Sequence, residues 1–231
     1  MSSADGCDSI DVVLPVLNEY DALPWVLSRI PDGYRAIVVD NGSTDGSAEL
    51  AKTMGATVVQ ATQRGFGAAC WAGLQAATAD IVCFMDADAS MDPLDLVKVV
   101  DPVRNDVADL VMGARDAEPR SLQFRNRIAN RYLASQISQR ANTPLTDLGP
   151  MRAIRRNVLI SLDMRDRRSG WPLEMVLRAA HHDLRICEVR VVYRARVGKS
   201  KVTGTLRGTL RAVRDMRRQL NDPSLFNNTS M

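Results

Sequence analysis

Short apolar runs alternate with amphipathic stretches through the first half of this chain, and that alternation limits its possible folds more than any other feature. The apolar runs are rich in Val and Ile and suit strands buried on both faces; they are Asp11–Leu17, Tyr34–Asp40, Ala56–Ala61, Asp80–Asp86 and Ala108–Ala114. The segments between them have helical character and are Tyr20–Arg29, Thr44–Met54, Gly67–Ala77 and Leu94–Arg104. Strands that alternate with helices predict an α/β fold with a doubly wound, mainly parallel sheet.

The second half of the chain has a less regular pattern. Its expected elements are helices at Leu122–Gln139 and Pro172–His182, strands near Met151–Arg155 and at Arg185–Arg194, and a last helix from Thr205 to Leu220. No repeat or linker divides the 231 residues. We therefore expect one domain over residues 1–220, followed by a flexible tail at 221–231.

Composition places the chain among ordinary globular proteins. Hydrophobic residues make up 45% and charged residues 25%, which excludes a disordered, collagenous or coiled-coil protein. No apolar run is long enough to span a bilayer, and the first ten residues lack the features of a secretory signal. The four cysteines are too far apart for a zinc site or a disulfide scaffold. The sequence thus predicts a cytoplasmic protein with reduced thiols.

The small net charge of +3 conceals a strong asymmetry between the two halves. Residues 1–114 carry 6 Lys or Arg against 17 Asp or Glu, whereas residues 115–231 carry 24 against 10. An acidic half suits a divalent cation, and an arginine-rich half suits phosphates or an anionic surface. Solvated surface charge is the alternative interpretation. Nucleic acid is not an expected partner, because few aromatic residues lie among the arginines.

Polar and acidic residues follow three of the predicted strands at the point where each strand ends. The first strand is followed by Asn18 and Glu19, the second by Asp40-Asn41-Gly42-Ser43-Thr44-Asp45-Gly46, and the fourth by Asp86-Ala87-Asp88-Ala89-Ser90. Ligands of open α/β sheets bind at the carboxyl ends of the strands. We expect these three acidic segments to converge on one edge.

The chemistry of these residues suits a nucleotide bound through a metal ion. Asp86 and Asp88 are two residues apart and can reach one Mg²⁺ or Mn²⁺, which prefer oxygen ligands and substrate phosphates. Asp40 can accept hydrogen bonds from a ribose or base, and Glu19 lies where a nucleobase could bind. The alternatives are Asx turns at the strand ends, with Asp40 capping the next helix.

A glycine-containing segment, Arg64-Gly65-Phe66-Gly67-Ala68-Ala69, leads from the third strand into a helix. Backbone N–H groups at such a position, together with an arginine, favour contact with an anion. A dinucleotide-binding fingerprint needs a third glycine and follows a first strand, whereas here Cys70 follows and the strand is the third. An NAD-dependent oxidoreductase is therefore a weak alternative, as is a phosphohydrolase that uses Asp86 and Asp88.

These motifs, in this order, resemble the family 2 glycosyltransferases of GT-A fold, and among them the branch similar to dolichyl-phosphate-mannose synthase. The resemblance extends from Asp11 to Arg214. It rests on Val13-Leu14-Pro15-Val16-Leu17-Asn18-Glu19, Val38 to Gly46, Asp86-Ala87-Asp88, Gly113-Ala114-Arg115, Asp147 to Arg156, Gly170 to Met175, Glu188 to Tyr193 and Gly198-Lys199-Ser200-Lys201. Two positions depart from the family pattern: Asn41 replaces a second aspartate, and Ser90 replaces a glutamine that serves as a metal ligand.

The resemblance implies a role for each motif. Residues 10–114 would form a nucleotide-sugar half, with the nucleoside held by Pro15, Leu17, Glu19, Asp40, Arg64 and Gly65. The diphosphate would bind at Asp86, Ala87 and Asp88 through Mg²⁺ or Mn²⁺. Residues 115–220 would form an acceptor half, with Arg115 and Arg127 on phosphate and with Asp147, Trp171, Glu174 and Lys201 on the acceptor and sugar. For Trp171 a place in the core, and for Lys201 a solvated loop, are the alternatives.

The expected activity is metal-dependent, inverting transfer of a sugar from a nucleoside-diphosphate sugar. A polyprenyl phosphate is the expected acceptor; because it is already an anion, it needs no protein base. A soluble hydroxyl acceptor is the alternative, and a carboxylate would have to take its proton. Asp147 and Glu174 are the candidates for this base, and the metal-binding Asp88 is the third expected catalytic residue. The sequence leaves homo-oligomerisation open.

The last predicted helix is basic and amphipathic. Apolar residues recur on one face at Leu206, Leu210, Val213, Met216 and Leu220, and arginines recur on another at Arg207, Arg211, Arg214 and Arg218. Such a helix can attach reversibly to the inner face of an anionic membrane. Packing of the apolar face on the protein's own core is the alternative.

Overall fold

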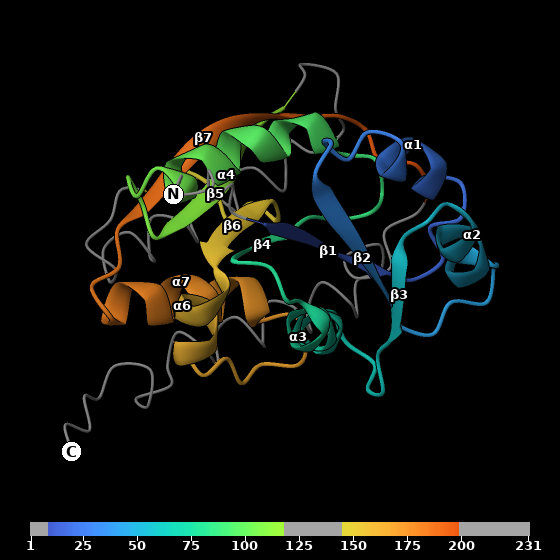
Figure 1. Ribbon diagram of the computed structural model, residues 1–231, viewed down its shortest axis with the longest axis horizontal. Helices are drawn as coiled ribbons and strands as arrows, with labels where there is room; N and C mark the ends of the chain where they lie inside the picture. The colour runs from blue at the N-terminus through green and yellow to red at the C-terminus, as the bar shows by residue number, and fades with distance from the viewer. Residues whose placement is uncertain (1–8, 118–144, 199–231) are drawn as a thin grey trace, which may run out of the picture.

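The computed structural model describes residues 9–117 and 145–198, which form a seven-stranded sheet with helices on both faces (Figure 1). The strand order is β3-β2-β1-β4-β6-β5-β7. The strands are β1 (Ile10–Val16), β2 (Tyr34–Asp40), β3 (Thr57–Gln60), β4 (Ile81–Phe84), β5 (Leu110–Ala117), β6 (Arg152–Arg155) and β7 (Ile186–Tyr193). The predicted α/β class is confirmed, and all seven expected strands are present with bounds shifted by up to three residues.

The helices are α1 (Leu23–Leu27), α2 (Ser47–Thr53), α3 (Phe66–Ala76), α4 (Leu96–Arg104), α6 (Arg156–Ser161) and α7 (Trp171–His181), with a 3₁₀ turn η1 (Pro93–Asp95) before α4. The short helix α6 was not predicted. The expected helices at residues 122–139 and 205–220, and the tail at 221–231, lie outside the described residues. Within the described ranges no helix is both long and apolar enough to cross a membrane.

The sheet is mainly parallel, as expected, with one reversed strand. β1 runs parallel to β2 and β4, β2 to β3, and β5 to β7. β6 is antiparallel to both of its neighbours, β4 and β5. Hydrophobic periodicity carries no information about strand direction, so this reversal could not be predicted from it.

Two apolar layers hold the sheet between the helices. Neighbouring residues of β1 point to opposite faces: Val12 packs in the layer under α1, α2 and α4, and Val13 packs in the layer over α3 and α7 (Figure 1). Helix α3 lies close to the sheet because Gly73 has no side chain, and a Cβ atom there would collide with Val13. Each fully buried Val or Leu in these layers contributes about 1.5–3 kcal/mol.

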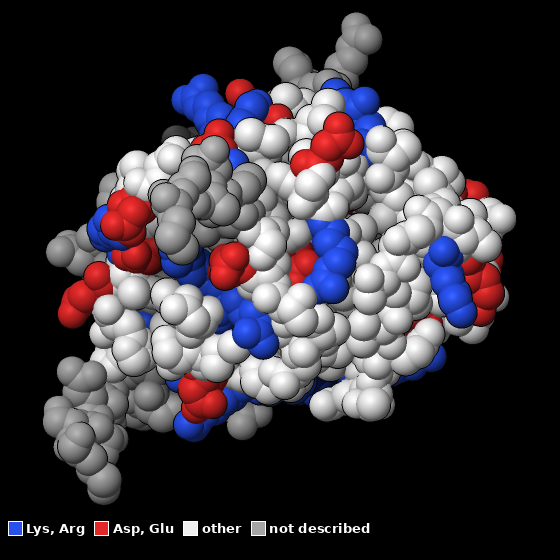
Figure 2. All heavy atoms as spheres, in the orientation of Figure 1, with Lys and Arg blue, Asp and Glu red and all other residues white. Residues whose placement is uncertain are grey.

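On one face of the described residues (Figure 2), the charge asymmetry of the sequence does not produce separate acidic and basic surfaces. On the face shown in Figure 2, basic and acidic side chains lie beside one another. Many arginines of the second half lie outside the described ranges. Several of the others form ion pairs, as with Arg115 and Asp147, Arg178 and Glu174, and Arg185 and Asp109.

Candidate active site

The three acidic segments converge on one edge, as predicted, because β2, β1 and β4 are neighbours in the sheet. Glu19, Asp40 and Asp88 are buried there. The segments after β1 and β2 are also hydrogen-bonded to each other: the Glu19 N–H donates to Ser47 Oγ over 3.0 Å, and the Thr44 N–H donates to Asn18 Oδ1 over 2.8 Å. The expected nucleoside residues Pro15 and Leu17, at the end of β1, are half-buried beside them.

Asp40 closes a turn with one of its carboxylate oxygens, and no hydrogen bond among the described residues engages the other. Its Oδ1 accepts the Ser43 N–H over 2.9 Å. Helix α2 begins only at Ser47 and has Gly46 at its N-cap, so the interpretation of Asp40 as a helix cap is wrong.

Two hydrogen bonds of Asn41 account for the asparagine at this position, where the family pattern has an aspartate. Its Nδ2 donates to the Gln63 carbonyl, and its Oδ1 accepts the Gly65 N–H, each over 2.9 Å. An aspartate could not make the first of these bonds. The contacts hold the segment after β3 against the segment after β2, which brings the exposed Arg64 beside Gly42. Arg64 and Gly65 thus lie next to the Asp40 turn, as expected.

The N-terminus of α3 does not offer the anion site that the glycine-containing segment predicts. The Gly67 N–H donates to the Arg168 carbonyl over 2.8 Å, and the Ala68 N–H donates to the Arg167 carbonyl over 2.9 Å. These carbonyls take the place of an anion. Gly65, at φ +145°, also lies so close that a Cβ atom would collide with the Arg167 carbonyl oxygen.

Asp86 and Asp88 differ in their surroundings. In the part of the chain that the structure describes, no hydrogen bond or ion pair engages the Asp86 carboxylate, and burial together with the nearby Asp88 charge raises its pKa to about 7. Asp88 accepts the Ser90 N–H at Oδ1 over 3.0 Å and meets Arg196 at Oδ2. Ala87, between them, is buried and has no side chain beyond Cβ to block a ligand.

These donors fit a hard divalent cation. The Ser90 hydroxyl, at the position of the family's glutamine, is buried and has no partner among the described residues. No group of three His, Cys, Asp or Glu side chains within the described ranges could hold a metal ion by itself. Two carboxylates with an unpaired hydroxyl nearby match Mg²⁺ or Mn²⁺, which take their remaining ligands from water and substrate phosphates.

Arg196 is a site residue that our sequence analysis missed. It follows β7, and its Nη2 lies 3.1 Å from Asp88 Oδ2 and 3.4 Å from Glu19 Oε1. The sequence could have indicated Arg196, because ligands of open α/β sheets bind at the carboxyl ends of the strands. Since β7 is parallel to β5 in the same sheet, the residues after Tyr193 deserved the same attention as those after the first, second and fourth strands.

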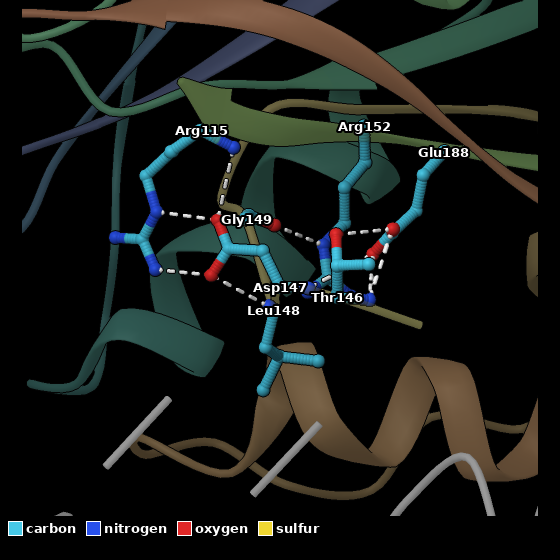
Figure 3. A network of polar contacts seen from close by, with 7 residues as sticks. All are labelled: Arg115, Thr146, Asp147, Leu148, Gly149, Arg152 and Glu188. Atoms are coloured by element: carbon cyan, nitrogen blue, oxygen red, sulfur yellow. Dashed lines mark hydrogen bonds and ion pairs between the residues drawn. The ribbon is translucent and has the colours of Figure 1, made fainter. Parts of the chain in front are cut away.

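Arg115 and Asp147 form a partly buried pair (Figure 3). Arg115 Nε and Nη2 each lie 2.7 Å from an Asp147 oxygen, and the N–H groups of Arg115 and Leu148 donate to the same carboxylate. Burial opposes the charge of Asp147, but these bonds outweigh it and hold its pKa below the ordinary value. The third guanidinium nitrogen of Arg115 points away from Asp147 (Figure 3).

Neighbouring bonds fix the loop that carries Asp147. The Thr146 hydroxyl donates to Glu188 Oε2 over 2.7 Å, and Arg152 Nε donates to the Gly149 carbonyl over 2.9 Å (Figure 3). Arg152 also reaches the Pro172 carbonyl at the start of α7. The loop is therefore attached to β7, β6 and α7 at once.

Trp171 and Glu174 lie inside the protein. Trp171 is 1% exposed and packs against Trp71 and Phe84, so it is a core residue in this structure. Glu174 is also 1% exposed and accepts hydrogen bonds from the N–H groups of Arg165 and Asp166 and from Arg178 Nε. It supports the loop before α7. Arg127 and Lys201 lie outside the described residues.

Comparison with known proteins agrees with this geometry. The sequence profile described as Glycosyl transferase family 2 matches residues 11–162. A Mycobacterium tuberculosis protein named only as an uncharacterized glycosyltransferase is 45% identical over 210 residues, which cover 90% of this chain and 96% of the relative. A dolichyl-phosphate hexose transferase of Haloferax volcanii is 32% identical over 200 residues, which cover 84% of this chain and 87% of the relative.

Among solved structures, the chain resembles glucosyl-3-phosphoglycerate synthase of Mycobacterium tuberculosis in complex with Mn²⁺, UDP-glucose and phosphoglyceric acid. The TM-score is 0.77 at 26% identity, and the match covers 96% of this chain and 80% of that one. These findings decide against the oxidoreductase and the phosphohydrolase. With this α/β fold and its acidic strand ends, the chain belongs to the family 2 glycosyltransferases of GT-A fold.

Proposed function

We propose that this glycosyltransferase moves a hexose from a nucleoside-diphosphate sugar to a phosphate-bearing acceptor, a polyprenyl phosphate, with inversion at the anomeric carbon and a divalent cation. One observation carries the proposal: Asp86 and Asp88 lie at the same edge as Asp40, with two arginines nearby. The pKa of Asp86 is raised by burial and by Asp88, while Arg115 and Arg196 act in the opposite direction. An anionic group that bridges these charges suits this edge.

The donor side follows from the segments after β1, β2 and β3. Pro15, Leu17, Glu19 and Asp40 would contact the nucleoside, and Arg64 and Gly65 would border it. Asp86 and Asp88 would hold the cation, with Ser90 beside them. When bound, the cation would stabilise the charge that develops on the departing diphosphate. The solved relative with Mn²⁺ and UDP-glucose supports this donor class.

The acceptor side centres on Arg115. Asp147 holds one edge of its guanidinium, so the remaining N–H groups are oriented for an acceptor phosphate. Such an acceptor attacks as an anion, without a base. Asp147 and Glu174, the candidate bases for a hydroxyl acceptor, have their carboxylates engaged by hydrogen bonds. We therefore assign them positioning roles: Asp147 orients Arg115, and Glu174 fixes the loop before α7. Arg127 and Lys201 stay acceptor-side predictions, whereas Trp171 would support that side from the core.

Two relatives suggest different sources of the acceptor phosphate. The name of the Haloferax volcanii relative specifies a dolichyl phosphate, whereas the solved Mycobacterium tuberculosis relative binds phosphoglyceric acid. The membrane-attached lipid is our choice, because the curated relative is the more similar in sequence. It agrees with the predicted basic helix at residues 205–220, which would bring the protein to the inner face of the membrane.

The test has two stages. Calorimetric titration with UDP, GDP and dTDP, with and without Mn²⁺, identifies the base, and we expect binding that Mn²⁺ strengthens. Transfer is then assayed to a polyprenyl phosphate, to the same lipid as a free alcohol and to 3-phosphoglycerate. Transfer to the lipid phosphate alone supports the proposal. Equal rates with the alcohol, or transfer only to 3-phosphoglycerate, would overturn the choice of acceptor, and binding of no nucleotide would overturn the donor class.

A further inference from the structure

The segment after β7 is attached to the turn that carries Asp88. The Arg194 N–H donates to the Ser90 carbonyl over 2.8 Å, and the Val197 N–H donates to the Asp88 carbonyl over 2.9 Å. Tyr193 also forms an isolated antiparallel bridge with Met91. The backbone on both sides of Arg196 is thus fixed, and only its side chain can move without breaking these bonds.

Arg196 compensates several acidic groups at once. Its Nη2 contacts both Asp88 and Glu19, and its charge also acts on Asp86. Its Nε is buried and has no acceptor among the described residues. A buried N–H group without an acceptor costs stability. The guanidinium is therefore held by carboxylates on one side and keeps an unused donor on another.

A cation at Asp88 would compete with this contact. Asp88 Oδ1 already accepts the Ser90 N–H, and Asp88 Oδ2 is the oxygen that meets Arg196. A cation bound to Asp88 would lie close to the guanidinium, and the two positive charges would repel each other. A diphosphate that arrives with the cation brings new negative charge, and a guanidinium pairs with phosphate through two parallel hydrogen bonds.

We infer that Arg196 is the counter-charge of Asp88 and Glu19 while the donor site is empty, and that it exchanges these carboxylates for the diphosphate when donor and cation bind together. The inference rests on the proposed function, because it needs a nucleoside diphosphate at this edge. It makes Arg196 a donor-binding residue that opposes the cation alone and favours the cation with its nucleotide.

The experiment compares wild-type protein with Arg196→Gln and with a matched control, Arg194→Gln. The Arg194→Gln substitution removes one positive charge from the same segment. The Arg194 guanidinium, however, lies over Trp25 and 3.8 Å from Asp92, and not at Asp88. Mn²⁺ binding without nucleotide is measured by electron paramagnetic resonance. Binding of UDP and GDP at saturating Mn²⁺ is measured by calorimetry, and circular dichroism checks the fold of each variant.

We expect opposite changes in the two affinities of Arg196→Gln. Mn²⁺ alone should bind about tenfold more tightly, and the nucleoside diphosphate at saturating Mn²⁺ about tenfold more weakly. Arg194→Gln should change neither by more than about twofold. Loss of both affinities together, or no change in Mn²⁺ binding, would overturn the inference and leave Arg196 a structural residue. If wild-type protein binds no nucleotide with Mn²⁺, the proposed function fails first, and the inference with it.

Discussion

Both ends of the sheet carry carboxylates near arginines, but hydrogen bonds engage the carboxylate of Asp11 at the amino end, whereas none among the described residues engages that of Asp86 at the carboxyl end. At the amino end of β1, Asp11 pairs with Arg35 through two contacts of 2.7 Å and accepts the N–H groups of Thr78 and Ala79. Burial opposes its charge, but these bonds outweigh burial and lower its pKa. At the carboxyl end of β4, Asp86 has a raised pKa and no such bonds among the described residues.

This difference assigns a structural role to one end of the sheet and a ligand-binding role to the other. At the amino end, Arg35 and the N–H groups of Thr78 and Ala79 already satisfy the Asp11 carboxylate. The Asp86 edge keeps negative charge that the protein itself only partly compensates, which costs stability until a ligand binds. Four substitutions test this contrast.

The largest effect is expected at Asp88. Asp88→Ala should reduce sugar transfer by about 10³-fold or more, because it removes a proposed ligand of the cation that stabilises the leaving diphosphate. The variant should still fold, with a melting temperature lowered by about a few degrees, because the Ser90 N–H and Arg196 lose an acceptor while Asp86 loses a repulsive neighbour. An active variant that is only less stable would make Asp88 a turn residue.

The next effect is expected at the opposite end. Asp11→Ala leaves Arg35 and two N–H groups without their acceptor, and should lower the free energy of unfolding in urea by about 3 kcal/mol. The folded fraction should keep its transfer rate. Asp101→Ala, which removes a more exposed and longer pair of 3.4 Å with Arg104, is the control and should cost less than about 1 kcal/mol. Equal losses in the two variants would contradict the contrast.

A pH-dependent effect of opposite sign is expected for Asp86→Asn in metal-free protein. The folded-state pKa of Asp86 is about 7, above the unfolded value of about 3.9, so the wild type loses stability as the pH rises between these values. The asparagine variant does not. The variant's gain in free energy of unfolding over the wild type should grow by about 2–3 kcal/mol from pH 5 to pH 8, as measured by urea denaturation with EDTA. A constant difference would mean that the Asp86 carboxylate is not strained by burial.

The smallest effect sharpens the comparison, because Asp147 is bonded like Asp11 but lies on the acceptor side. Asp147→Asn removes the charge and one of the two acceptor oxygens that orient the Arg115 guanidinium. The KM for the acceptor should therefore rise about tenfold, which corresponds to about 1.4 kcal/mol of binding free energy. The KM for the donor and the pH profile of the rate should not change. Loss of the alkaline rise in rate, with little change in the KM for the acceptor, would instead identify Asp147 as a base.

The sequence predicts the donor edge well because short-range patterns encode it. Continuous Val and Ile runs mark the buried strands, and polar residues directly after them mark the strand ends, so the meeting of Glu19, Asp40 and Asp88 follows from the parallel order. The same reasoning fails for the helix start at Gly67 and Ala68, since their partners, the carbonyls of Arg167 and Arg168, come from a distant loop. Long-range contacts of backbone atoms leave no trace in the residue pattern.

The acceptor side is harder to predict for a related reason. Asp147 and Glu174 have the residue types of catalytic acids, and their sequence neighbours do not reveal that Arg115, Arg178 and backbone N–H groups occupy them. Arg196 was missed because its importance depends on where β7 ends relative to β4. Residue type identifies a group's chemistry, whereas its partners decide whether that chemistry is still open to a ligand.

The attachment between α3 and the loop before α7 has a consequence for how the acceptor side can diversify. The loop is attached through the carbonyl oxygens of Arg167 and Arg168, and every amino acid carries such a carbonyl. Side chains in this loop can therefore be replaced without losing these two hydrogen bonds, while Gly65 leaves no room for substitution beneath them. Under the proposed function, substitutions at residues 167 and 168 could change acceptor contacts and leave the attachment to α3 in place, above the constant support of Gly65.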